Sequence, residues 1–267
     1  MIKVPKFSIS ILIFSFVFAF FGDFLYSKSP FEFSKDLIML PPSLEHLFGT
    51  DRLGRDVLAR VISGLEISLI IGFFSAVISA LIGLIVGISS GLFSRIFDKV
   101  AIVIIDLFLT FPTFFLLLAL VSYINASVVI LIFVISITSW MSMARIIRSE
   151  AFAIAKAPFI KVLKIAKVSK SKIIFKYFTP LLAPIFLVNF TFSFSGAILA
   201  ESSLSFLGLG VMPPQISLGL LLSEGKEIID IAPWVSFFPG LFIFLITFSL
   251  INISDYLQSR FNQREVL

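Results

Sequence analysis

Long apolar runs alternate with shorter polar segments along the chain. Each run is about 20 residues long, the length that an α-helix needs to cross the hydrocarbon core of a bilayer. Six such runs follow one another, at Ile9–Tyr26, Ser68–Phe93, Val100–Ser122, Ala126–Ala144, Leu181–Leu199 and Trp234–Ile253. The pattern predicts an all-α membrane protein with six transmembrane helices, and an even number of crossings places both termini on one side of the membrane.

The spacing of the runs divides the chain into three parts. These are a first transmembrane helix, an extramembrane loop that leads into a short helix, and a five-helix core, over residues 1–27, 28–65 and 66–267. The first run follows Lys3 and Lys6, as the apolar part of a signal peptide follows its charged front. Phe20 and Phe21 place bulky rings where a peptidase needs small side chains, so we expect an uncleaved helix.

Composition places the chain among integral membrane proteins. Of its 267 residues, 58% are hydrophobic and 14% charged, and the mean hydropathy is +1.10. Ordinary soluble domains carry about 25% charged residues. The chain has no cysteine, so it offers neither disulfides nor thiolate metal sites. Its net charge of +5 lies in residues that flank apolar runs, which favours a role in membrane topology over nucleic-acid binding.

The distribution of Lys and Arg predicts the orientation. Fifteen of the 21 basic residues lie on the side of the termini, and six lie on the other side. Cytoplasmic loops carry the excess of Lys and Arg in membrane proteins. Both termini and the basic segment 145–180 are therefore expected in the cytosol, and the loop 28–65 outside it.

The basic segment 145–180 is longer than a connection needs to be. It carries nine Lys and Arg residues against one acid, Glu150. Apolar side chains recur in it at helical spacing, at Ile154, Ala157, Ile160, Leu163 and Ile165. We interpret the segment as an amphipathic helical element to which a soluble partner binds.

The second run carries small residues four apart, which lie on one face of a helix. They are Ser75, Ser79, Gly83, Gly87 and Gly91. Small side chains let two helices approach closely in lipid. The face is expected to pack either within this chain or against a second subunit, and the sequence does not separate the two.

An acid and a proline lie within the third run. An acidic side chain in hydrocarbon costs about 2.5–3.5 kcal/mol, so Asp106 is expected to face the bundle interior or a wet cavity. A polar contact with a neighbouring helix is the favoured role for Asp106, and a proton relay is the alternative. Pro112 interrupts the hydrogen-bond ladder, and we expect it to bend the helix.

A segment rich in serine and glycine, Glu201–Gly210, follows the fifth run and precedes Pro213 and Pro214. Its composition predicts a re-entrant or interfacial turn on the outer side. Glu201, with Ser203 close by, is a candidate for contact with a translocating ligand or a partner protein. The alternative is a helix-end acid held by backbone amides.

The sequence gives no sign of catalysis. His46 is the only histidine, so neither a His-based triad nor a His-based metal site can form. The segment from Gly219 to Glu227 differs from a phosphate-binding loop in spacing and lacks the Ser or Thr after its lysine. We expect no enzymatic activity, no cofactor and no metal.

Several motifs, in order, resemble those of permease subunits of ABC importers of the dipeptide, oligopeptide and nickel group. Gly49–Val57 reads GTDRLGRDV, Asp106 and Pro112 match a D-x5-P pattern, and Glu201–Gly210 reads ESSLSFLGLG. Ala232–Gly240 matches the pattern APWx4PG. The resemblance covers about residues 47–255. It implies the type I importer permease fold and an extracytoplasmic motif that includes Gly49, Thr50, Asp51, Gly54, Arg55 and Asp56.

The cytosolic loop departs from the family pattern. Where the family has an E-A-A triplet, this chain has Lys161, Val162 and Leu163, and where the family has a glycine it has Lys167. The resemblance implies a helix over Phe159–Lys170 that sits in a cleft of the ATPase. The residues assigned to this coupling loop are Glu150, Phe159, Lys161, Val162, Leu163, Lys167, Ser169 and Pro180.

The resemblance also implies partners and a location. This chain would form the translocation path with a second permease subunit in the prokaryotic cytoplasmic membrane, with two cytosolic ATPases and an extracytoplasmic substrate-binding protein. Peptides are the commonest cargo of the family. Residues assigned to the path or its packing are Asp106, Pro112, Glu201, Ser203, Gly83, Gly87 and Gly91. Two other functions stay open, a proton-driven transporter that uses Asp106 and a membrane scaffold that does not transport.

Overall fold

The computed structural model describes residues 4–92, 95–124 and 126–262. Lys3 and Arg264, both used in the charge count, lie outside these residues. The described elements are helices and helical turns joined by loops. In order they are α1 (Lys6–Leu25), η1 (Lys35–Leu37), α2 (Val57–Leu92), α3 (Arg95–Thr110), α4 (Thr113–Val121), α5 (Val128–Lys156), α6 (Pro158–Ile165), α7 (Lys170–Ile173), η2 (Ile174–Phe178), α8 (Thr179–Phe206), α9 (Leu218–Lys226) and α10 (Trp234–Asn262).

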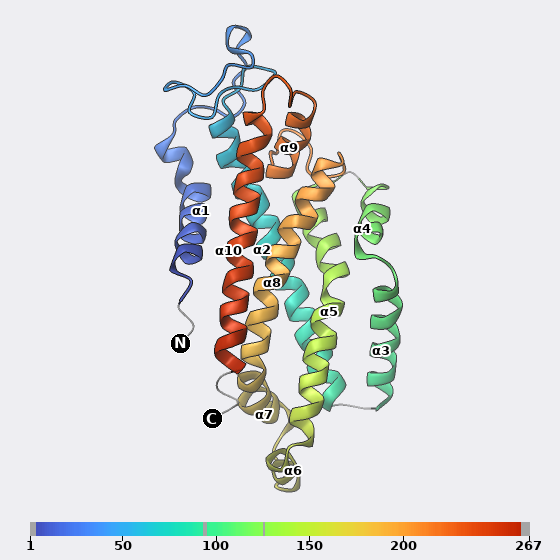
Figure 1. The fold of residues 1–267 in the computed structure, drawn as a ribbon. Coiled ribbons are helices and arrows are strands. Elements are labelled where there is room, and N and C mark those ends of the chain that lie inside the picture. The colour runs from blue at the N-terminus through green and yellow to red at the C-terminus, as the bar shows by residue number, and fades with distance from the viewer. Residues whose placement is uncertain (1–3, 93–94, 125, 263–267) are drawn as a thin grey trace.

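The long helices form an up-and-down bundle (Figure 1). Helices α2, α5, α8 and α10 lie side by side, and α8 runs in the direction opposite to the other three. Helices α6 and α7 lie at one end of the bundle, called here the α6 end. Helix α9 and the loop between α1 and α2 lie at the other, called the α9 end. Helix α1 runs toward the α9 end and α10 runs back, as six crossings require.

Five helices are long and apolar enough to cross a membrane, or six if α3 and α4 count as one broken span. The predicted third span is therefore not a single helix. Its two halves are bent by 85° around Pro112, which has no N–H group to continue the ladder. The predicted bend at Pro112 is confirmed, and it is sharp enough to separate two helices.

Several predicted helix boundaries are wrong, because polar residues at the ends of the runs remain helical. Helix α2 begins at Val57, where the Asp56 carboxylate accepts a hydrogen bond from the Ala59 N–H at 3.0 Å and caps the first turn. The predicted loop 28–65 thus ends at Asp56, and its short helix is the first part of α2. Residues 95–99, predicted as part of a connection, belong to α3.

The predicted turn Glu201–Gly210 is also partly wrong. Helix α8 continues through Phe206, and the turn begins only at Leu207, just before Gly208 with φ +80°. Ser205 lies within the helix and donates to Glu201 at 2.6 Å, so its hydroxyl does not compete for the backbone bonds. Side-chain chemistry therefore outweighs the turn-like composition of this stretch.

The basic segment 145–180 is mostly helical. Helix α5 extends through Lys156, and α6 ends at Ile165, five residues before the predicted end at Lys170. Lys167 follows with φ +54°, a left-handed conformation that a helix cannot contain. The segment thus folds as the end of α5, the short α6 and the beginning of a helix that continues into α8.

The small-residue face of α2 packs against α5 within this chain. A Cβ atom built on Gly83, Gly87 or Gly91 would lie 2.6–2.9 Å from side-chain atoms of Met143, Ile147 or Ala151 respectively. The two backbones can approach this closely because glycine has no side chain.

We predict that Gly87→Ala destabilises the α2–α5 packing. The new Cβ atom would lie 2.7 Å from Ile147 Cβ and 2.9 Å from the Arg148 backbone nitrogen, so the helices must move apart. Overpacking of this kind costs about 1–3 kcal/mol. Thermal unfolding of the purified chain in detergent measures the effect. Gly196→Ala is the matched control, because the space around that helical glycine is open and alanine should stabilise by about 0.5–1 kcal/mol.

Candidate functional site

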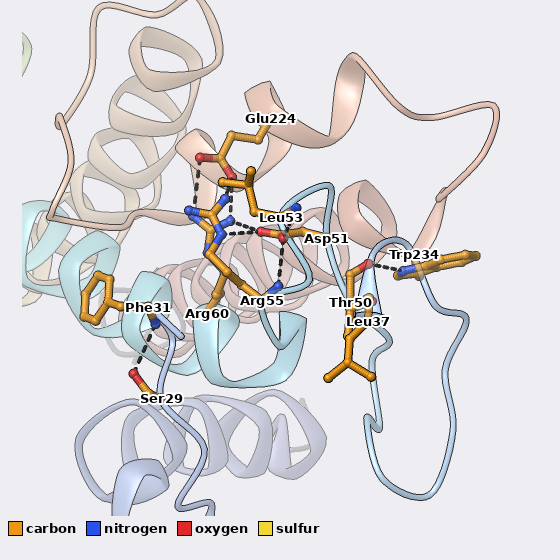
Figure 2. Close-up of polar contacts among 10 residues, drawn as sticks. All are labelled: Ser29, Phe31, Leu37, Thr50, Asp51, Leu53, Arg55, Arg60, Glu224 and Trp234. Atoms are coloured by element: carbon orange, nitrogen blue, oxygen red, sulfur yellow. Dashed lines mark hydrogen bonds and ion pairs between the residues drawn. The ribbon is translucent and has the colours of Figure 1, made fainter. Parts of the chain in front are cut away.

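The GTDRLGRDV segment forms a buried ion-pair network at the α9 end (Figure 2). Asp51 Oδ2 lies 2.6 Å from Arg55 Nε and 2.5 Å from Arg60 Nη1. Glu224, on α9, lies 3.1 Å from Arg55 Nη2 and 2.6 Å from Arg60 Nη1. Two guanidinium groups thus alternate with two carboxylates and join the loop, α2 and α9.

Hydrogen bonds between the Asp51 side chain and backbone amides hold the same segment in a compact turn. Asp51 Oδ1 accepts from the N–H groups of Leu53 at 2.8 Å and Arg55 at 3.0 Å. Gly49 and Gly54 both have φ +73°, and a Cβ on Gly54 would lie 1.9 Å from the Ser34 carbonyl oxygen. The two glycines are therefore required by the backbone, and the aspartate by the amides that it accepts from.

Thr50 connects this turn to α10 and to the preceding loop. The Trp234 indole Nε1–H donates to the Thr50 carbonyl oxygen at 3.1 Å (Figure 2). The Thr50 hydroxyl accepts from the Leu40 N–H at 2.8 Å and donates to the Leu37 carbonyl. The turn is thereby fixed to α10 and to the chain that precedes it.

Asp56 fastens the end of α1 to the beginning of α2. Its Oδ2 accepts from the Tyr26 hydroxyl at 2.7 Å and lies 2.8 Å from His46 Nδ1. Burial and the hydrogen bond to Asp56 raise the pKa of Tyr26 above its ordinary value. Lys28 Nζ lies 3.8 Å from the same oxygen. The only histidine is thus part of a polar cluster that links two helices.

Glu201 lies at the α9 end of α8 and is completely buried. Its carboxyl oxygens accept from Ser68 of α2 at 2.9 Å and from Ser205 at 2.6 Å, and Ser202 lies at 3.4 Å. Serine hydroxyl groups therefore hold the Glu201 carboxyl group, in place of the backbone amides of the predicted alternative. Ser203, on the same helix, is exposed.

Helix α6 has one buried and one exposed apolar side at the opposite end of the bundle. Ile160 is fully buried, and Leu163 packs into the same cluster. Phe159, Val162 and Ile165, three residues apart, are exposed. Lys161 is exposed next to them. The helix thus rests on the bundle through one face and offers an apolar and basic face to the outside.

Lys167 occupies the position of a helix-terminating glycine. The Val168 N–H donates to the Leu163 carbonyl at 3.1 Å, and the two side chains belong to one apolar cluster. This pattern, with the left-handed φ of Lys167, is a Schellman motif, in which glycine is the usual residue. Ser169 then occupies the N-cap position of α7, without a capping bond from its side chain.

Glu150 and Pro180, assigned to the coupling loop, line a cavity of about 640 Å³ between α5, α8 and α10. Asn189 of α8 and Asp255 of α10 also line it. The cavity lies in the half of the bundle that is closer to α6.

Asp106 does not face the interior of the bundle within this chain, which was the first of its two predicted environments, the second being a wet cavity. Its side chain is 57% exposed and pairs with Arg145 of α5. A second pair, Asp98 to Arg148 at 2.6 Å, joins the same two helices. Asp106 therefore makes a polar contact with a neighbouring helix, the role that the sequence favoured. None of the described ion pairs or hydrogen bonds joins Asp106 to Glu201.

The structure adds residues that the sequence did not single out. Arg60 and Glu224 complete the network of Asp51 and Arg55, and Ser68, Ser205 and Ser217 surround Glu201. Arg60 lies about one helical turn after Asp56, so the sequence could have indicated that Arg60 lies close to the charged residues of the GTDRLGRDV segment. Glu224 lies 164 residues from Arg60 in the chain, and no local pattern could have paired them.

Comparisons with known proteins identify the family of the chain. The sequence profile of the family described as "Binding-protein-dependent transport system inner membrane component" matches residues 80–264. The oligopeptide transport system permease protein OppC of Escherichia coli (strain K12) is 37% identical over 226 residues, 84% of this chain and 75% of that protein. The dipeptide transport system permease protein DppC of Alkalihalophilus pseudofirmus is 34% identical over 250 residues, 93% of this chain and 82% of that protein.

A solved structure supports the fold assignment. The MetNI methionine ABC transporter, in an inward-facing conformation, aligns with a TM-score of 0.57 over 74% of this chain and 96% of the matched chain. Sequence identity in this alignment is 16%, so the likeness concerns the fold. With the family match and the permease relatives, these findings show that the chain belongs to the binding-protein-dependent inner membrane components and is a multi-pass permease subunit of an ABC importer.

Proposed function

We propose that this permease imports dipeptides or oligopeptides. The observation that carries the proposal is the 37% identity to OppC over 84% of the chain, together with the 34% identity to DppC. In this proposal the chain forms half of a translocation path with a second permease subunit. An extracytoplasmic binding protein delivers the peptide, and two cytosolic ATPase subunits drive the cycle. This chain itself hydrolyses no ATP.

In the proposed orientation the α6 end is cytosolic, as the excess of basic residues on that side favours. Helix α6 inserts into a cleft of the ATPase with its exposed face, formed by Phe159, Val162 and Ile165. Its buried face, with Ile160, keeps α6 attached to the bundle when the ATPase subunits close. Movement of the ATPase is thereby passed to the transmembrane helices.

The charge of α6 defines the surface that can receive it. Lys161 stands where the family carries an acid, and Lys167 adds a second positive charge. A cleft built for an acid would repel this helix, whereas an acidic cleft would complement it. The proposed ATPase partner therefore carries acidic residues where α6 docks.

Family membership decides between the three functions that the sequence left open. It favours the ATP-driven permease over a proton-driven transporter and over a scaffold. The exposed pair of Asp106 with Arg145 is consistent with a structural role.

The test is peptide uptake by the complete complex in proteoliposomes. Uptake of a labelled peptide should require internal ATP and the binding protein, and should continue when a protonophore removes the proton gradient. Uptake that stops with the protonophore and ignores ATP would contradict the proposal.

A further inference from the structure

The structure gives Glu201 a set of partners that the proposed function does not use. Its carboxyl group is completely buried, and both oxygens accept hydrogen bonds. These hydrogen bonds replace the water that the buried carboxyl group has lost. An isolated buried carboxylate is costly, so the source of its stabilisation matters.

That source is the first turn of α9. The Leu218 N–H donates to Ser68 Oγ at 3.1 Å, and the Ser68 hydroxyl donates to Glu201 Oε2 at 2.9 Å. In the second chain of bonds, the Leu220 N–H donates to Ser217 Oγ at 3.1 Å. The Ser217 hydroxyl donates to Ser205 at 3.3 Å, and Ser205 donates to Glu201 Oε1 at 2.6 Å.

Two chains of serine hydroxyl groups, called here relays, thus connect N–H groups of the first turn of α9 to one carboxyl group. These N–H groups have no partner among the backbone carbonyls of the helix. They form the positive end of the helix dipole, which favours a negative charge. Ser68 comes from α2 and Ser205 from α8, so the relays join three helices. The carboxyl group of Glu201 accepts the last hydrogen bond of both relays.

The far end of α9 is fixed to the outer loop. Glu224 pairs with Arg60 at 2.6 Å and with Arg55 at 3.1 Å. Helix α9 therefore bridges Glu201 at its first turn and the GTDRLGRDV segment at its last. A displacement of α9 would move that segment with it.

The same helix that carries Glu201 also reaches the α6 end. Residues Lys170–Phe206 form a continuous helical stretch of 37 residues, about 55 Å long at 1.5 Å per residue. The stretch begins four residues after Ala166, close to α6, and ends beyond Glu201. A shift imposed on α6 therefore reaches Glu201 along one helix.

We propose that Glu201 is a positioning residue of the transport cycle. It fastens α9 to α8, so that movement of α8 also moves α9 and the GTDRLGRDV segment. The inference rests on the proposed coupling through α6. It assigns no contact between Glu201 and the cargo. Loss of the Glu201 contacts should uncouple α9 from α8, so that ATP is hydrolysed without transport.

The experiment compares variants in the assembled complex in proteoliposomes. Peptide uptake and ATP hydrolysis are measured together, and the ratio of the two is the readout. Glu201→Gln and Ser205→Ala should each lower the ratio about fivefold or more while ATP hydrolysis continues. Glu201→Asp, which retains the carboxylate, should restore part of the ratio lost in Glu201→Gln.

The control is Ser193→Ala, the same substitution about three turns earlier in α8 and outside the relays, which should keep the wild-type ratio. A wild-type ratio in Glu201→Gln or in Ser205→Ala would overturn the inference. So would a parallel loss of uptake and hydrolysis, which indicates a structural role only. If Glu201→Gln does not assemble, Ser205→Ala decides. A wild-type complex without ATP-driven uptake would instead contradict the proposed function.

Discussion

We expect deletion of residues 156–172 to abolish ATP-driven uptake and to leave membrane insertion intact. The deletion removes the last residue of α5, α6, the turn after it and most of α7, while the apolar parts of the membrane-crossing helices remain. In the proposed mechanism the ATPase binds α6, so without α6 its closure would not move the permease. Uptake in proteoliposomes and the amount of chain in the membrane fraction measure the two parts of this prediction.

A single substitution tests the exposed face of α6 without removing the helix. Val162→Asp places a charge in the centre of the exposed face of α6 without changing its buried face. Hot-spot truncations cost about 2 kcal/mol or more, so ATPase affinity should fall about thirtyfold. The measurement is co-purification of the ATPase. Leu44→Asp, at an exposed apolar residue at the α9 end, should retain it. Full uptake by the deletion would refute a coupling role for α6.

We expect Arg60→Gln to destabilise the protein by about 3–5 kcal/mol, because the largely buried carboxylates of Asp51 and Glu224 would then share the single guanidinium group of Arg55. The Arg60 side chain is 2% exposed and pairs with both Asp51 and Glu224. Denaturant unfolding in detergent measures the loss. Arg52→Gln is the control, since its pair with Glu227 is on the surface, with 44% of the arginine side chain exposed. The control should cost about 1 kcal/mol or less.

The two substitutions Arg60→Gln and Glu224→Gln should also be coupled. The double variant should cost less than the sum of the single variants, because the second change removes one of the two carboxylates that would otherwise share Arg55. Equal losses in Arg60→Gln and Arg52→Gln would show that the network contributes no more than a surface pair.

Local rules explain what was predicted well. A proline removes a backbone donor wherever it stands, so the break at Pro112 could be predicted without a partner helix. A helix in the basic segment was likewise predictable, because Ile160 and Leu163 recur at helical spacing in a polar stretch. The packing partner of Gly87 was not visible, since a small-residue face fits any close helix equally well.

The sequence by itself determined the class of the protein, its apolar runs, the bend at Pro112 and the presence of a short helix in the basic segment, because run length, proline and helical spacing act within a few residues. Only the tertiary structure decided where the helices end and what Glu201 and Arg60 bind. Hydrocarbon requires apolar side chains but does not mark the last residue of a helix, so α2 and α8 extend through polar residues. Buried polar side chains must find partners wherever the fold brings them. Ser68 and Glu201 are 133 residues apart, and only the packing of α2 against α8 joins them.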